Sequence, residues 1–204
     1  MTDRPPESTG STSSSDSRGT TGAKCALAVK GLMGIEAITW GSGSSWRTGT
    51  GVPDHIAAPI ELMCFELLPY ALLRAAHISE KTFLLGMRNR SSTKYDGGSE
   101  AWAGFLCDPV SKDRVPVDEL AGLRTVAGDV IVMIGASADA FHTVIVSGTA
   151  STGPAKEGPM IYSLADRSPT SDPTEMTLGK IIAQFLPYET VAVQVFTVKP
   201  GLLE

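Results

Sequence analysis

Residues 128–148 read GDVIVMIGASADAFHTVIVSG, and this stretch decides the fold class. It contains two runs rich in β-branched residues, DVIVMI (129–134) and FHTVIVS (141–147), which predict two buried strands. MIYSL (160–164) predicts a third strand, and TVAVQVFTV (190–198) predicts a fourth with cleaner alternation. Turn-like links between the first three strands favour an antiparallel meander.

Helical spacing appears before this strand region and between its last two predicted strands. IELMCFELLPYALLRAAH (60–77) is the strongest helical stretch, and MTLGKIIAQFL (176–186) predicts a later helix. The apolar face of the first stretch follows the i, i+3, i+4 spacing and consists of Cys64, Leu67, Leu68, Ala71, Leu72 and Ala75. Helices followed by strands predict an α+β fold rather than an alternating β-α-β plan.

The chain has 204 residues, enough for one domain. Residues 1–24 are rich in Ser, Thr, Gly and Pro and lack aromatic residues, Val, Ile and Leu, so we expect a disordered tail. Residues 25–204 are then expected to form a single α+β domain, which begins where the sequence turns apolar at Cys25.

Charge and composition exclude several classes of function. The net charge is −5, which argues against nucleic-acid binding through a basic surface. No apolar run is long enough to span a bilayer, and the first residues do not resemble a Sec signal. The three cysteines and three histidines lack metal-ligand spacing, so we expect no metal and no cofactor. We expect the chain to be cytoplasmic as synthesised; the alternative is export by a specialised system that needs no Sec signal.

Two residues suggest thiol chemistry. Cys64 lies near the start of the strongest predicted helix, where the macrodipole favours a thiolate nucleophile. His142 lies at the head of the second predicted strand, and an imidazole there can take the thiol proton. Taken singly, each residue has a simpler interpretation, since free cysteines and strand histidines commonly belong to a core.

Four segments together resemble the papain-like thiol hydrolases of the NlpC type, including bacterial effector and toxin domains. They are MCFELLPYALLRA (63–75), GDVIVM (128–133), FHTVIVSG (141–148) and MIYSLAD (160–166). The resemblance covers about half of the chain. It implies a papain-like α+β fold in which N-terminal helices, with the cysteine on a helix N-terminus, pack on an antiparallel sheet.

The resemblance also implies roles for individual residues. Cys64 would be the nucleophile and His142 the general base, and a third polar group one strand on would orient the imidazole. The candidates are Ser163 and Tyr162, only one of which can share the face of His142, and then Asp166. Pro69 departs from the pattern, because it removes a backbone donor from the helix unless the helix starts after Cys64.

The expected function is hydrolysis of an amide or isopeptide bond in a protein, a peptide or a peptidoglycan peptide, in the manner of a peptidase or amidase. The chain would then be a bacterial effector or toxin. One alternative is a glutamine deamidase or transamidase of the same fold. A second is a catalytically inactive binding module, and a third is an unrelated α+β interaction protein with Cys64 and His142 in its core. The oligomeric state is left open.

Overall fold

The computed structural model describes residues 13–33, 38–41, 60–92, 104–137, 140–148, 157–165, 173–185 and 190–203. Helices and strands follow along the chain in this order: α1 Ser13–Lys30, β1 Ile38–Trp40, β2 Ile60–Leu62, η2 Cys64–Glu66, α2 Leu67–Arg74, α3 Glu80–Ser92, β3 Cys107–Pro109, β4 Val115–Pro116, η3 Val117–Gly122, β5 Val130–Gly135, β6 Ala140–Val146, β7 Met160–Ser163, β8 Thr174–Thr177, α5 Leu178–Gln184, β9 Thr190–Val198 and η6 Pro200–Leu202.

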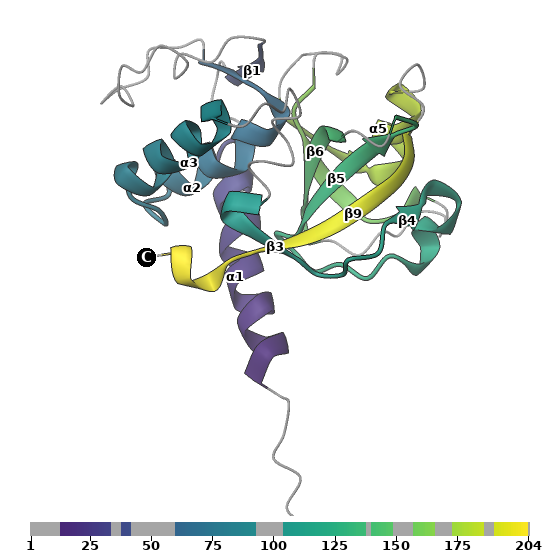
Figure 1. Ribbon diagram of the computed structural model, residues 1–204, viewed down its shortest axis with the longest axis horizontal. Coiled ribbons are helices and arrows are strands. Elements are labelled where there is room, and N and C mark those ends of the chain that lie inside the picture. The colour runs from purple at the N-terminus through teal and green to yellow at the C-terminus, as the bar shows by residue number, and fades with distance from the viewer. Residues whose placement is uncertain are drawn as a thin grey trace, which may run out of the picture.

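Within these residues the main sheet is antiparallel and has the order β3-β9-β5-β6-β7-β8, with β4 also paired to β9. The predicted meander is therefore confirmed for the three strands β5, β6 and β7. The fourth predicted strand, β9, returns to pair with β5 on its other side. The α+β class is confirmed as well, because helices pack on a mostly antiparallel sheet (Figure 1).

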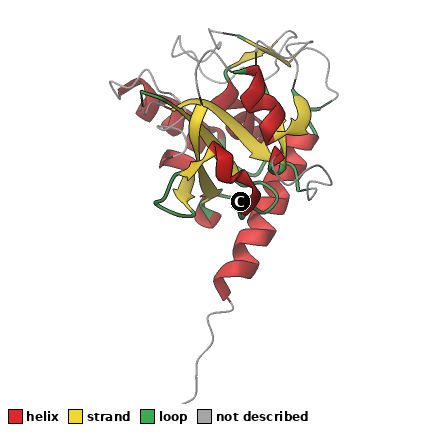
Figure 2. Cartoon of the chain, turned by 90° about the vertical axis from the view of Figure 1, so that its right-hand side faces the viewer, coloured by secondary structure: helices red, strands yellow, loops and turns green. Residues whose placement is uncertain are grey.

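Alternation along the strands sends side chains into two clusters. Val130 and Val132 of β5 join a core that includes residues of α1 and α2. Ile131 and Met133 of the same strand join a second core that includes Leu178 of α5. The sheet thus separates the two cores, with α1, α2 and α3 gathered on one side and α5 on the other (Figures 1 and 2).

The expectation of a disordered tail over 1–24 is wrong from Ser13 onward, because α1 starts there. The buried side of α1 carries Thr21, Gly22, Cys25, Ala26, Ala28 and Val29, at helical spacing. Most of these are small residues, whose weak hydrophobicity hides a helix that tertiary packing stabilises. Residues 1–12 lie outside the described part of the chain.

The predicted helix over 60–77 is correct only in its middle. Residues Ile60–Leu62 form β2, which pairs in parallel with β1. A single 3-10 turn, η2, then begins at Cys64, and α2 follows from Leu67 to Arg74. The second predicted helix, over 176–186, begins two residues later in the structure than predicted. Met176 and Thr177 belong to β8, and the Thr177 side chain caps α5.

Candidate functional site

Cys64 is the first residue of η2 and follows the extended residue Met63. The buried carboxylate of Glu66 accepts a hydrogen bond from the Met63 backbone N–H at 2.9 Å, which secures the start of this turn. Because α2 starts at Leu67, Pro69 is its third residue, where no intrahelical donor is needed. The conflict raised by Pro69 is thereby removed. The Cys64 side chain is buried, with 6% of its surface exposed.

His142 lies on β6 and is almost fully buried, at 2% exposure. Its Nε2 is 3.0 Å from Oγ of Ser163 on β7. The ring of Phe185, at the end of α5, covers the imidazole with a centroid distance of 4.6 Å and a tilt of 37°. Burial lowers the pKa of His142 to about 3, so this histidine is neutral at physiological pH.

Of the two predicted partners that the structure describes, Ser163 is the one that hydrogen-bonds to the imidazole. Tyr162 points to the other face of the sheet, where it belongs to the core on the α1 and α2 side. Burial, aided by Glu175, raises its pKa, which keeps the phenol neutral. Asp166 lies outside the described residues.

The helical turn that carries Cys64 contacts the strand that carries His142, since η2 packs against β6. Cys64 itself belongs to the core on the α1 and α2 side, whereas His142 shares its strand face with Val144 and Val146 of the α5 side. A β-bulge lies next to His142: Met133 pairs with His142 and Ile134 with Ala140, so that Phe141 is the extra residue. Bulges of this kind bend a strand end and redirect its side chains.

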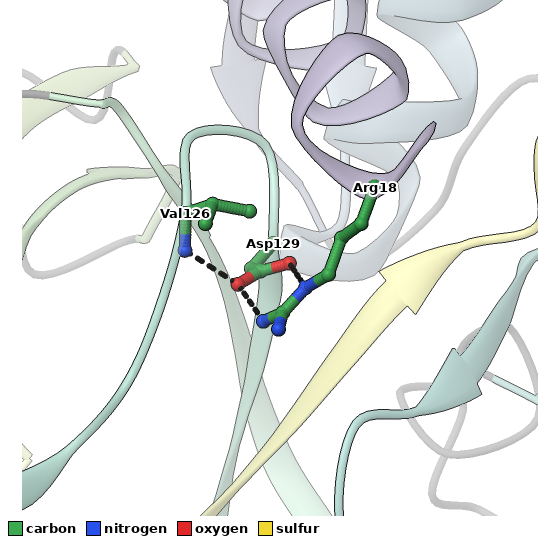
Figure 3. Close-up of polar contacts among 3 residues, drawn as sticks. All are labelled: Arg18, Val126 and Asp129. Carbon is green, nitrogen blue, oxygen red and sulfur yellow. Dashed lines mark hydrogen bonds and ion pairs between the residues drawn. The ribbon is translucent and has the colours of Figure 1, made fainter. Parts of the chain in front are cut away.

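A turn at Gly128 and Asp129 precedes β5, with Gly128 at a φ of +77°. The Asp129 carboxylate is fully buried and accepts the Val126 backbone N–H at 2.7 Å. It also accepts hydrogen bonds from Nε and Nη2 of Arg18 on α1, one on each carboxylate oxygen (Figure 3). Sequence reasoning missed Arg18, because it lies in the segment expected to be disordered and 111 residues from its partner.

The other two cysteines are buried, unpaired thiols in the core on the α1 and α2 side. Burial raises the pKa of Cys25 to about 12 and also raises that of Cys107. Both remain protonated, which makes them poor nucleophiles.

Upstream of Cys64, Trp40 of β1 pairs with Leu62 of β2, two residues before η2 begins. Trp40 is partly buried. Trp46 lies outside the described residues. Of the helices that the structure describes, none combines the length and apolarity needed to cross a bilayer. Within the same residues no three His, Cys, Asp or Glu side chains are grouped as ligands for a metal ion.

Comparison with known proteins finds matches among solved structures. No family model and no curated protein sequence matches the chain. Two crystal structures of an N-acetylmuramoyl-L-alanine amidase from Bacteroides uniformis ATCC 8492 share its fold, with TM-scores of 0.59 and 0.56. Each match covers 89% of this chain and 100% of the amidase chain at 12% sequence identity. The chain therefore has an amidase-like α+β fold.

Proposed function

We propose that this protein hydrolyses an amide bond of a peptide substrate, with Cys64 as the nucleophile. His142 is the general base, and Ser163 orients its imidazole. The observation that carries the proposal is the hydrogen bond of 3.0 Å between His142 Nε2 and Ser163 Oγ, on a strand that packs against the turn beginning at Cys64. Support for an amide substrate comes from the amidase fold.

The proposed reaction begins with transfer of the Cys64 proton to His142, which requires a movement that brings the two side chains together, because they lie on opposite faces of the sheet. Because Nε2 is engaged by Ser163, Nδ1 is the nitrogen that accepts this proton. The thiolate attacks the carbonyl carbon, and the Cys64 backbone N–H is one donor for the oxyanion. His142 then protonates the leaving amine, a thioester forms, and water hydrolyses it to the acid and the free thiol. The pKa of about 3 leaves the resting imidazole neutral, but it also makes that imidazole a weak base, so the proposed proton transfer needs the pKa of His142 to rise when substrate binds.

The test is hydrolysis of peptidoglycan stem-peptide fragments, unrelated peptides and glutamine-containing peptides, with products identified by mass spectrometry. Cys64→Ser and His142→Gln should each lower kcat/KM by at least about 100-fold. Ser163→Ala should lower it about 10-fold or more, because the imidazole loses its oriented partner. Cys25→Ser is the matched control, since it removes another buried thiol outside the proposed site. Full activity of Cys64→Ser would refute the mechanism. Release of ammonia without chain cleavage would instead assign a glutamine deamidase.

A second candidate is a binding module of the same fold without catalysis. The burial of Cys64 and His142, at 6% and 2% exposure, favours it, because a nucleophile must meet its substrate. Alkylation by iodoacetamide in native buffer separates the two functions. Rapid labelling of Cys64 that is lost in His142→Gln supports the hydrolase. Labelling of Cys64 only after denaturation supports the binding module.

A further inference from the structure

Phe185 is the residue that covers the imidazole of His142. It caps the C-terminal end of α5, and its ring centroid lies 4.6 Å from that of His142. Phe141, the extra residue of the bulge, packs its edge against Phe185 at 5.6 Å and 61°. The ring is itself buried, at 8% exposure, within the core on the α5 side. Helix α5 and the bulged end of β6 thus enclose the imidazole together.

The histidine now has two distinct environments. Ser163 supplies one polar contact to Nε2, and the phenyl ring supplies an apolar wall. The titratable groups on neighbouring described elements are the Cys64 thiol and the Glu66 carboxyl of η2, and the Tyr162 phenol of β7. Strand β5 contributes no titratable group, and Lys180 of α5 is exposed.

We propose that Phe185 is a positioning residue, whose ring excludes water from one face of His142 and so keeps the imidazole neutral and directed at Ser163. This inference rests on the proposed function for its catalytic meaning, but the control of His142 by Phe185 is measurable without turnover. An opposing effect exists, since a protonated imidazole is attracted to an aromatic face. That attraction would raise the pKa of the imidazole by roughly one unit, whereas full burial lowers it by about 3–5 units.

The experiment is an NMR titration of histidine side chains in the full-length protein, with the His142 signals assigned by their loss in His142→Gln. In the wild type, His142 should stay neutral throughout the range in which the protein is folded. Phe185→Ala should raise the pKa of His142 by roughly one to three units, because water reaches the imidazole. Phe185→Tyr, which keeps the ring, should not. If Phe185→Ala fails to fold, Phe185→Val should give a smaller shift in the same direction.

The control is Ile181→Ala, one turn earlier on α5 and in the same core, which loosens packing but keeps the Phe185 ring that contacts the imidazole. The inference is overturned if Phe185→Ala leaves the pKa of His142 unchanged or lowers it, or if Ile181→Ala shifts it equally. In the active enzyme, the acid limb of the kcat/KM profile should move with this pKa. A wild-type protein that cleaves no amide bond refutes the proposed function, while the NMR titration still decides the effect of Phe185.

Discussion

At the residue scale, the buried polar side chains near the site avoid an isolated charge in two different ways. Asp129 is fully buried and is paired with Arg18 and the Val126 N–H. His142 is equally buried but has a hydroxyl partner instead of a counter-ion, so it is neutral. Both solutions satisfy the rule that an unpaired charge in a protein interior is costly.

The depressed pKa of His142 makes stability depend on pH. Its folded-state pKa of about 3 lies below the reference of about 6.5 for an unfolded chain. The unfolded chain therefore binds more protons between these values, and the free energy of unfolding falls as pH drops through this window. The slope from this one group approaches about 1.4 kcal/mol per pH unit. Urea unfolding at about pH 7 and about pH 5 should show a lower free energy of unfolding at the lower pH in the wild type. The decrease should be smaller in His142→Gln. Equal losses in the two proteins would contradict the neutral, buried histidine.

Breaking the ion pair between α1 and β5 should be costly. Arg18→Met leaves the Asp129 carboxylate buried without its counter-ion, and we expect a loss of about 3 kcal/mol in the free energy of unfolding. Asp108→Asn is the control, because Asp108 is 66% exposed and lies 3.7 Å from Lys199. Its effect should stay below about 1 kcal/mol. Chemical denaturation measures the free energy of unfolding of both variants. Similar losses would refute the expectation that the buried ion pair stabilises the protein more than the exposed one.

At the element scale, α1 crosses the turn before β5 at very short range. A Cβ atom built on Gly22 would lie 2.0 Å from the Ala127 carbonyl oxygen, and one built on Gly128 would lie 2.0 Å from the Gly22 carbonyl oxygen. Two glycines therefore allow the helix and the turn to touch through their backbones. This contact and the Arg18–Asp129 pair fix α1 against the strand that leads into the candidate site.

Substitutions of two glycines on α1 should have opposite signs. Gly22→Ala must push the helix away from the turn, and we expect destabilisation by about 2 kcal/mol or more. Gly19→Ala meets nothing within 4 Å, so it should stabilise the protein by about 0.5–1 kcal/mol through higher helix propensity. Thermal unfolding followed by circular dichroism compares them. A neutral or stabilising Gly22→Ala would show that the close approach does not exist in solution.

At the scale of the whole molecule, the sheet separates two hydrophobic cores, and both α1 and β9 contribute to this arrangement. Helix α1 covers one face, and β9 pairs along β5 near the middle of the sheet. The C-terminal η6 also lies near α1. Helix α1 and strand β9 therefore both help to close the folded unit, in which Cys64 lies in the core on the α1 and α2 side and His142 lies on the α5 side of the sheet.

Truncation tests this closure. A chain that starts at Ser13 keeps every described contact and should unfold at an unchanged temperature. A chain that lacks residues 1–30 loses α1 and exposes the core side chains of α2 and β9 that pack against it. We expect it to lose cooperative thermal unfolding, because removal of a packed helix leaves a large apolar surface in water. Cooperative unfolding of the shorter chain at the wild-type temperature would refute a structural role for α1.

Much of the local structure follows from the sequence alone. Runs rich in β-branched residues predicted β5, β6 and β9, and the short apolar run MIYSL predicted β7, each to within a residue or two, because such runs suit a buried strand. The pairing of Cys64 and His142 came from a resemblance, and its catalytic role stays a prediction. Helix α1 was missed because its buried stripe is made of small residues, which carry little hydrophobic signal.

Tertiary structure alone decided which residues meet. Period-two alternation required that either Ser163 or Tyr162 share the face of His142, but only the register of β6 and β7 selected Ser163. The pairing of Arg18 with Asp129 and the cover of His142 by Phe185 join segments that are distant in sequence. The physical reason is that a sequence pattern reports which side of its own element a residue occupies, whereas packing determines what faces that side.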